Sequence, residues 1–300
     1  NVDGGNCRIN DYGKETMAVK KLNLTEVVAT TIMGLVVLGI TAVFLWIVGD
    51  VVWQGSLELS WEFLSREPLN AGREGGIFPI LVSTFLILLV CLGVTIPLAI
   101  GTAIFLTEFV KPDSWFGQLT GISLDILAGA PSIVFGLFGN VFFTKILGLG
   151  FSILAGGLTL AGMVLPILIR STQEGLRSVP DDYRQVGAAL GLSRMAILKR
   201  ILLVAAMPGI AAGLLLGIGR AIAETAALMF TSGYVTRMPH SVLDSGRSLS
   251  IHIYDLAMNV PGGEGKAYAT ALVLVMLLIL INVAVFAFAM KFRRAWLSGI

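Results

Sequence analysis

The chain has 300 residues, of which 56% are hydrophobic and 13% are charged, and its mean hydropathy is +0.87. Soluble domains carry about a quarter charged residues, so this composition excludes an ordinary globular protein and indicates a helical membrane protein. The net charge of +2 gives no indication of nucleic-acid binding. Two cysteines and two histidines predict neither a disulfide framework nor a metal site.

The N-terminal residues 1–22 are predicted to be a polar tail that precedes the membrane domain. Residues 1–16 are rich in Gly and Asn, show no periodicity, and precede Met17, which has the features of a native start. We therefore expect 1–16 to be an extension and residues 23–294 to form the membrane domain.

Six apolar runs reach the roughly 20 residues that a helix needs to cross about 30 Å of hydrocarbon. They predict membrane crossings at about 26–48, 77–106, 117–143, 151–173, 201–230 and 268–290. The predicted fold class is therefore all-α, a polytopic membrane protein with six transmembrane helices.

The distribution of Lys and Arg predicts the orientation of these crossings. With both termini in the cytoplasm, Arg220 lies in the membrane and six of the other Lys and Arg residues lie outside, namely Arg66, Arg73, Lys145, Arg237, Arg247 and Lys266. The remaining fourteen of the 21 lie on the cytoplasmic side, as the positive-inside rule requires.

The predicted cytoplasmic segment 174–200 begins with a helix-start pattern. Pro180 suits a first helical position, where its missing N–H costs nothing. Asp181 and Asp182 then suit the first turn, because negative charge stabilises a helix N-terminus.

The same segment contains a turn signal in its middle. The residues up to Leu190 are good helix formers, Gly191 is expected to be left-handed, and Ser193 is expected to cap a second helix. Two short helices joined at a glycine make a rigid knuckle that suits a groove on another protein. The alternative is a solvated loop between two crossings.

The fifth predicted crossing carries two charges, Arg220 and Glu224, which need a reason because a charged side chain in the bilayer costs several kcal/mol. At about 100° per residue, with Gly213 as zero, Arg220 falls at about −20° and Glu224 at about 20°. The two side chains are four residues apart and are therefore predicted to pair on one helical face.

Small residues share this face of the helix. Gly209 falls at about −40° and Gly217 at about 40° from Gly213, and glycines four apart let membrane helices approach closely. The charges are therefore expected to point into a helix–helix interface or a water-filled path. Thr225, at about 120°, lies off the stripe and is expected to bond backbone or a neighbouring helix.

Arg220 suits the binding of a phosphate-like oxyanion, because its planar fork donates hydrogen bonds to two oxygens at once. Glu224 would hold Arg220 when no anion is bound, or accept a proton from a protonated phosphate. The alternative is an Arg–Glu pair that only fixes helix packing. Buried pairs stabilise poorly compared with apolar packing, which favours the functional interpretation.

Other polar residues in the apolar runs leave two interpretations open. Pro131 and Ser132 predict a helix break that offers a hydroxyl to a path, or a packing kink only. Asp125 is a second intramembrane acid, which either transport or a wet pocket near the cytoplasmic side explains. His240 and His252 lie in the last outer loop and are interpreted as surface residues.

The knuckle resembles the cytoplasmic motif of ABC importer permeases, which reads Glu-Ala-Ala, three residues, Gly, nine residues, then Ile-x-Leu-Pro. Gly191, Ile201 and Leu203 match it, whereas the first three residues and the final Pro are replaced. In that family the knuckle inserts into the ATPase subunit. The resemblance therefore implies ATPase coupling through Asp181, Asp182, Arg184, Gln185, Gly187 and Gly191.

Three further runs resemble phosphate ABC transporter permeases. Residues 220–231 are similar to Arg-x-x-Gly-Glu-Thr-Ala-Pro-Leu-Leu-Phe-Thr, with Ala223 and Ala227 in place of Gly and Pro. Residues 130–136 are similar to the Pro-Ser-Ile-Val-x-Gly signature, and residues 248–254 are similar to the PstA-type subunit. The resemblance covers about residues 20–294.

This resemblance implies a type I ABC importer permease fold and a subunit that forms half of the translocation path of an ATP-driven phosphate importer. The chain would have no catalytic residues and no cofactor of its own, since ATP is used by the partner ATPase. The path would be lined by Arg220, Glu224, Thr225, Pro131 and Ser132, and the glycines at 209, 213 and 217 would serve helix packing.

The implied partners are a second permease subunit of the PstC type, a homodimeric ATPase and an extracytoplasmic phosphate-binding protein. The implied location is the bacterial plasma (inner) membrane, with multiple crossings and both termini cytoplasmic. Two alternatives remain open: a permease for another oxyanion, such as sulfate or molybdate, and a secondary transporter or channel that works without ATP.

Overall fold

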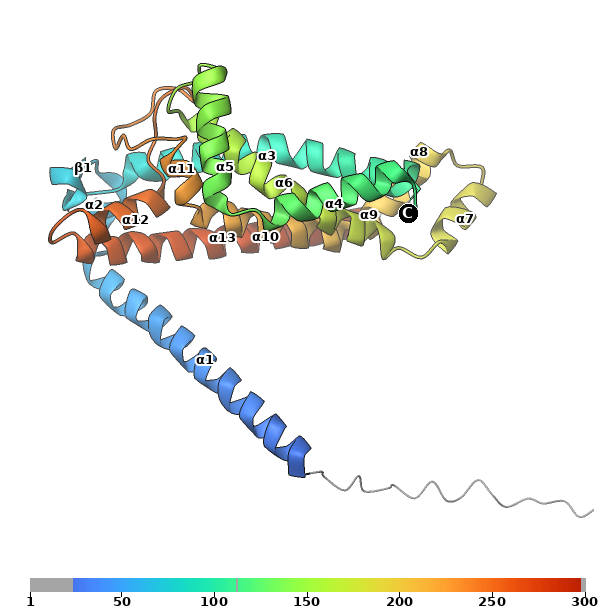
Figure 1. Cartoon of the computed structure of the whole chain (residues 1–300), viewed down its shortest axis with the longest axis horizontal. Helices are drawn as coiled ribbons and strands as arrows, with labels where there is room; N and C mark the ends of the chain where they lie inside the picture. Colours follow the sequence, from blue (N-terminus) through green and yellow to red (C-terminus); the bar gives the residue numbers. More distant parts are fainter. Residues whose placement is uncertain (1–23, 112, 298–300) are drawn as a thin grey trace, which may run out of the picture. The chain divides into compact units, whose positions relative to one another are not determined.

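The computed structural model describes residues 24–111 and 113–297, with side chains for 27–111 and 113–291. The described chain is mainly helical and contains one two-stranded sheet (Figure 1). Its contacts form two compact units, residues 1–49 and 50–300, and each is described by itself. The predicted polar tail, residues 1–22, lies outside the described residues.

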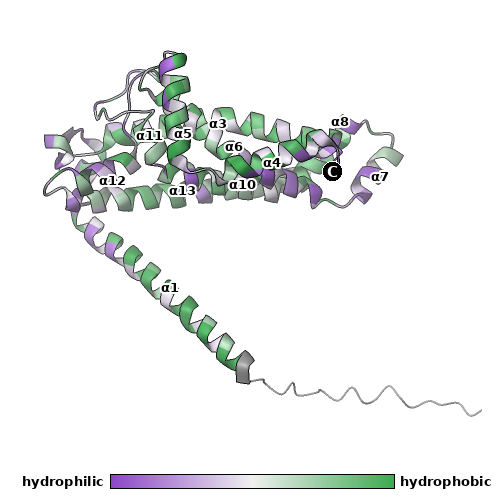
Figure 2. Cartoon of the chain, viewed as in Figure 1, coloured by the Kyte–Doolittle hydropathy of each residue, from purple (hydrophilic) through white to green (hydrophobic). Residues whose placement is uncertain are grey.

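Four helices of the described chain are long and apolar enough to cross a membrane without a break. Figure 2 shows that apolar residues predominate along much of their length. They correspond to the predicted first, second, fourth and sixth crossings. They are α1 (Leu24–Glu58), α3 (Phe78–Ile104) with its π-helical extension η2 (Phe105–Phe109), α6 (Ile153–Arg177) and α13 (Glu264–Leu297).

The third predicted crossing is broken rather than straight. It consists of α4 (Trp115–Gly129) and α5 (Ser132–Gly139), extended by the π-helix η3 (Asn140–Ile146), with a bend of 98° between the two parts. Ala130 and Pro131 between them have extended backbone. Proline lacks an N–H and disfavours the helical conformation of the residue before it. The predicted helix break at Pro131 is confirmed.

The fifth predicted crossing, 201–230, is not one continuous helix. Its first part contains α8 (Arg194–Ile197), the π-helix η4 (Leu198–Leu202) and α9 (Leu203–Ala205), and it meets α10 (Met207–Ala223) at a bend of 62°. Pro208 causes this bend, because it cannot donate a backbone hydrogen bond to the preceding turn. Beyond α10 the chain forms only the short helix α11 (Ala226–Met229).

Short elements fill the remaining connections of the second unit. α2 (Trp61–Ser65), β1 (Pro68–Leu69), the 3₁₀-helix η1 (Asn70–Gly72) and β2 (Glu74–Gly75) lie between α1 and α3. The strands are antiparallel, with Pro68 opposite Gly75. α7 (Asp182–Ala189) follows α6, and α12 (Leu249–Met258) precedes α13.

α6 is the central helix of the second unit. In its most apolar stretch 67% of residues are buried, compared with 44% for α3 and 6% for α13. Its side chains enter several apolar clusters, through Leu160, Leu168 and Leu176 in turn. The loop after α11 closes its N-terminus, because Ile153 donates its N–H to the carbonyl of Asp244 at 2.9 Å. α5, α10 and α11 all contact α6.

The predicted glycine stripe of α10 packs directly on α6. A Cβ added to Gly209 would lie 2.6 Å from the Cα of Gly175, one added to Gly213 would lie 2.6 Å from the Cβ of Ser171, and one added to Gly217 would lie 2.6 Å from a methyl of Val164. Real Cβ atoms do not approach so closely, so the two helices touch through backbone. In this structure the three glycines lie against α6, a helix of the same chain.

We expect Gly209→Ala to destabilise the protein, because the new methyl meets the backbone of Gly175 and overpacking of this kind costs about 1–3 kcal/mol. Gly162→Ala, on α6, is the matched control, since a Cβ there would meet nothing within 4 Å. Alanine is the better helix former, so this control should keep or raise stability. Thermal unfolding of the purified protein in detergent measures both, and equal unfolding temperatures for the two variants would contradict this packing.

Candidate functional site

The knuckle, residues 180–200, has the two-helix form that the sequence predicts. α7 begins at Asp182, two residues later than the predicted helix start at Pro180, and ends at Ala189. Gly191 has a φ of +73°, as expected for a left-handed turn. The hydroxyl of Ser193 accepts a hydrogen bond from the N–H of Ala196 at 3.2 Å and so caps α8.

Gly187 lets the two helices of the knuckle pack closely. A Cβ at this position would lie 2.8 Å from a side-chain carbon of Ile197, which is itself buried. The role of Gly187 is therefore to hold α7 against α8. Its buried position shows that it supports the shape of the knuckle from within.

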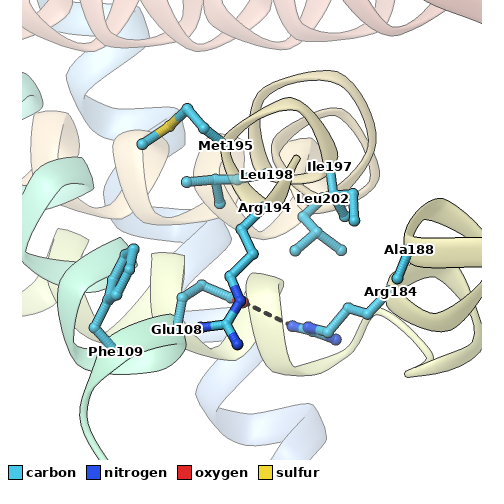
Figure 3. Close-up of a pocket in the computed structure, with 9 residues that line it drawn as sticks. All are labelled: Glu108, Phe109, Arg184, Ala188, Arg194, Met195, Ile197, Leu198 and Leu202. Atoms are coloured by element: carbon cyan, nitrogen blue, oxygen red, sulfur yellow. Dashed lines mark hydrogen bonds and ion pairs between the residues drawn. The ribbon is translucent and has the colours of Figure 1, made fainter. Parts of the chain in front are cut away.

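Arg184 points inward and bonds the body of the protein (Figure 3). Its guanidinium forms ion pairs with Glu108 at 2.8 Å and Asp181 at 3.0 Å, and it also donates to the carbonyls of Val179 and Leu176. The hydrogen bond to Glu108 raises the pKa of Arg184 above its ordinary value. Arg184 was predicted as an ATPase contact, but in this structure its charge is used internally.

The outward face of the knuckle combines apolar and polar side chains. Exposed apolar residues are Tyr183, Val186, Leu190 and Met195. Asp181, Asp182 and Gln185 are also exposed, and Figure 2 shows hydrophilic positions among the apolar ones at this end of the unit. These exposed side chains can contact another protein, and the Asp181 carboxylate also pairs with Arg184. The exposed face is compatible with the predicted coupling role.

A cavity of about 370 Å³ lies beside the Arg184–Glu108 ion pair (Figure 3). Three charged side chains line it, those of Glu108, Arg184 and Arg194, together with apolar side chains of η2, α8 and η4. Open space therefore lies next to the Arg184–Glu108 pair. Among the described residues, this is the one ion pair between the knuckle and the second span.

The predicted pairing of Arg220 with Glu224 is wrong for this structure. α10 ends at Ala223, and Glu224 has an extended backbone with a ψ of 122°, so the helical angle assumed for Glu224 does not apply. Its carboxylate instead accepts a hydrogen bond from the N–H of Ala227 at 3.2 Å, at the start of α11. Glu224 is nearly buried, with 9% of its surface exposed.

Arg220 is half-buried near the end of α10. Within residues 27–111 and 113–291, its guanidinium forms no ion pair and no hydrogen bond. A cation within a membrane span needs a counter-charge or water, because burying an isolated charge in the bilayer is costly. Arg220 can therefore offer its full set of donors to a ligand.

The break at Pro131 lies on an element that packs against the chain after Glu224. A Cβ added to Gly136 of α5 would lie 2.8 Å from the Cα of Ala227 in α11. Asn140 donates its side-chain N–H to the carbonyl of Phe230 at 2.7 Å. α5 and α11 therefore pack against each other, and each follows a helix break, with Pro131 and Ser132 at one and Glu224 and Thr225 at the other. Thr225 makes no side-chain cap bond to α11.

Asp125 pairs with an arginine of α6. Arg170 donates to the Asp125 carboxylate at 2.6 Å and to the carbonyl of Gly121 at 2.7 Å. The Asp125 side chain is 68% exposed, so this acid is not enclosed in the unit. The partner is 45 residues away in the sequence, and sequence reasoning missed it.

A polar side chain of α12 holds the backbone at Glu224. Ser250 of α12 donates its hydroxyl to the Glu224 carbonyl at 2.6 Å. At the same end of α12, Arg247 pairs with Asp255 at 2.7 Å and approaches the Nδ1 atom of His252 at 3.4 Å. His252 is fully buried, so its interpretation as a surface residue is wrong. The turn at Gly72 covers its ring.

Residues 24–111 and 113–297 contain no group of three or more His, Cys, Asp or Glu residues that could hold a metal ion. The structure thus offers the guanidinium of Arg220 as a binding group for an anion, the exposed face of the knuckle as a docking surface, and helix breaks within two apolar spans.

Comparison with known protein families identifies the chain. Residues 95–295 match the family described as binding-protein-dependent transport system inner membrane component. The chain belongs to this family. It is a multi-pass membrane permease of an ABC transport system, and it is not an enzyme, because the ATPase of such a system is a separate subunit. Its partners include that ATPase and a binding protein.

Curated relatives match most of the permease. The probable ABC transporter permease protein YqgI of Bacillus subtilis (strain 168) is 31% identical over 246 residues, which cover 78% of this chain and 83% of the relative. The phosphate transport system permease protein PstA of Mycobacterium leprae is 33% identical over 214 residues, covering 70% of each chain.

A solved structure has the same fold. The permease resembles a chain from a bacterial ABC transporter involved in the import of the acidic polysaccharide alginate, with a TM-score of 0.62 and 12% identity over 89% of this chain and 98% of that chain. The predicted all-α, type I ABC importer permease fold is confirmed. Six spans result when each bent pair counts as one crossing.

We expect His252 to make the permease less stable as the pH falls. Burial, together with the nearby charge of Arg247, lowers the pKa of His252 from 6.5 to about 4, although Asp255 acts in the opposite direction. Between these values the unfolded chain binds a proton that the folded chain does not, so the free energy of unfolding decreases as pH falls.

Thermal unfolding measured at neutral pH and at mildly acidic pH tests this. His252→Asn should reduce the shift in unfolding temperature between the two, whereas His240→Asn, at an exposed histidine, should keep the wild-type shift. An unchanged shift in His252→Asn would show that the buried imidazole does not carry the effect.

Proposed function

We propose that this permease is the PstA-type subunit of an ATP-driven phosphate importer and forms half of its translocation path. The observation that carries the proposal is the half-buried guanidinium of Arg220, which has no partner among the described side chains and lies beside a break in the apolar span. The phosphate transport permeases among its relatives, including PstA of Mycobacterium leprae, support the choice of anion. So does the Arg-x-x-x-Glu-Thr-Ala run that begins at Arg220.

In the proposed assembly the chain lies in the bacterial plasma (inner) membrane with both termini cytoplasmic. Its partners are a PstC-type permease subunit, a homodimeric ATPase and an extracytoplasmic phosphate-binding protein. The positive-inside distribution of Lys and Arg supports this orientation. The chain binds no cofactor, and ATP is used by the ATPase alone.

Arg220 is the proposed anion contact in the path. A guanidinium binds two phosphate oxygens through parallel hydrogen bonds, and such charge-assisted bonds strengthen where water is excluded. In this structure Glu224 is held by Ala227 and Ser250 rather than by Arg220. Glu224 therefore acts as a fixed neighbouring charge, which favours a protonated phosphate over a fully charged anion.

The helix breaks supply the remaining parts of the proposed path. The backbone leaves the helical conformation at Pro131 and at Glu224, and irregular backbone at membrane depth is tolerated where it lines a cavity. Ser132 and Thr225, next to these breaks, are both half-exposed and can offer hydroxyl groups to the anion.

The knuckle is the proposed ATPase contact, through Asp181, Asp182, Gln185 and the exposed apolar side chains beside them. Gly187 and Gly191 fix its shape rather than touch the partner. When ATP closes the ATPase dimer, movement of the knuckle would pass through α7 and α8 to the spans and change which side of the membrane the path faces.

We expect Arg220→Gln to abolish most phosphate uptake while the ATPase still co-purifies with the permeases. Hydrogen bonds that involve charged groups contribute about 1.5–3 kcal/mol, so the loss should be at least about tenfold. Arg220→Lys keeps the charge without the planar fork and should give an intermediate loss. Uptake of labelled phosphate by proteoliposomes that contain the complex and its binding protein is the measurement.

Arg66→Gln is the control for the loss of an arginine, because Arg66 is an exposed residue of the outer side that pairs only with Glu62. Surface pairs contribute little, so uptake should be kept. Wild-type uptake in Arg220→Gln would refute the anion contact. Competition by sulfate or molybdate in the same vesicles would reassign the substrate to another oxyanion.

A further inference from the structure

The Arg184–Glu108 ion pair joins the knuckle to the second membrane span. The atoms lie 2.8 Å apart, and only 27% of the Arg184 side chain and 19% of the Glu108 side chain are exposed. Among the described residues it is the one ion pair that links residues 180–200 to another span. The same guanidinium donates to carbonyls at the end of α6, so a single side chain bridges α7, α6 and η2.

Glu108 lies in a part of the helix with unusual geometry. It belongs to η2, a π-helical extension that continues α3 without a turn between them. Single π-helical turns are uncommon and occur frequently at functional sites. α3 then runs the full span beside α6, where a Cβ on Gly157 would lie 2.6 Å from Val90. A displacement of Glu108 would therefore act on the end of α3, which is packed along α6.

Apolar contacts alone do not fix the direction of the knuckle. Ile197, Leu198 and Leu202 join the cluster around Leu176 and Val179, but apolar burial is non-directional. The cavity of about 370 Å³ beside the ion pair leaves room for rotation of the knuckle. A charge-assisted bond from a planar fork has a preferred geometry, so it can set an orientation that the apolar cluster leaves free.

We propose that Glu108 is a positioning residue that binds Arg184 so that the knuckle and α3 move as one body. This inference rests on the proposed function of the knuckle as the ATPase contact. Figure 3 shows the arrangement it depends on: Glu108 on η2 faces Arg184 across the cavity edge, and Arg194 of α8 lines the same cavity. Without this bond, the ATPase moves the knuckle while the second span lags behind.

The first test measures anion uptake per ATP hydrolysed in proteoliposomes that contain the whole complex, with inorganic phosphate as the probe. Coupling between sites commonly corresponds to factors of about 5 to 150, so Glu108→Gln should lower this ratio by about fivefold or more. ATPase association should be kept. In an Arg184→Gln background, Glu108→Gln should have no further effect, because both residues act through one bond.

Asp113→Asn is the matched control. It removes an exposed acid from the same cytoplasmic connection, five residues beyond Glu108, and its carboxylate forms no bond in the described structure. It should keep the wild-type ratio. An unchanged ratio in Glu108→Gln would overturn the proposal. A loss of ATPase from purified Glu108→Gln complexes would also overturn it, since the residue would then serve docking or folding.

The second test does not depend on the transported anion. Amide hydrogen exchange in the complex, with and without ATP, should change in both α7 and η2 of the wild-type protein. In Glu108→Gln the response of α7 should remain and that of η2 should disappear. A wild-type response of η2 in this variant would contradict the proposal. Failure of wild-type vesicles to take up phosphate would refute the substrate assignment alone, because this readout requires only ATP.

Discussion

The contact between α6 and α10, in which Gly175 meets Gly209 through backbone, positions both functional regions of the permease. α6 is buried along most of its length, and its C-terminal end leads through Leu176 and Val179 into the knuckle. α10 runs along it and ends where Glu224 leaves the helix. A side chain at these glycines would separate the two helices, and the knuckle and the helix break would then lose their common support.

Three arginines, Arg184, Arg170 and Arg220, differ in what their charges bind. We infer their different roles from this. Arg184 has two carboxylates and two carbonyls as partners, and Arg170 has a carboxylate and a carbonyl. Arginines paired in this way hold elements together. Arg220 has no partner among the described side chains. An unpaired cation at membrane depth is costly unless a ligand or water uses it, which is why the anion is assigned there.

Local sequence signals predicted much of this arrangement, because turns, caps and helical faces depend on near neighbours. Gly191, Ser193 and the break at Pro131 follow from such rules, as does the stripe that begins at Gly209. The same angular reasoning failed at Glu224, because it assumed that α10 continues past Ala223.

Sequence reasoning could not predict the contacts that the fold creates between residues far apart in the chain. Glu108 lies 76 residues from Arg184, and the ring of His252 is buried by the distant turn at Gly72.

ATP hydrolysis is expected to drive phosphate through this permease. The most direct test of this expectation is ATP hydrolysis by the reconstituted complex with the binding protein, when phosphate, sulfate or molybdate is supplied. Phosphate should stimulate hydrolysis and the other anions should not. Stimulation by sulfate or molybdate alone, or phosphate uptake without ATP, would contradict the account.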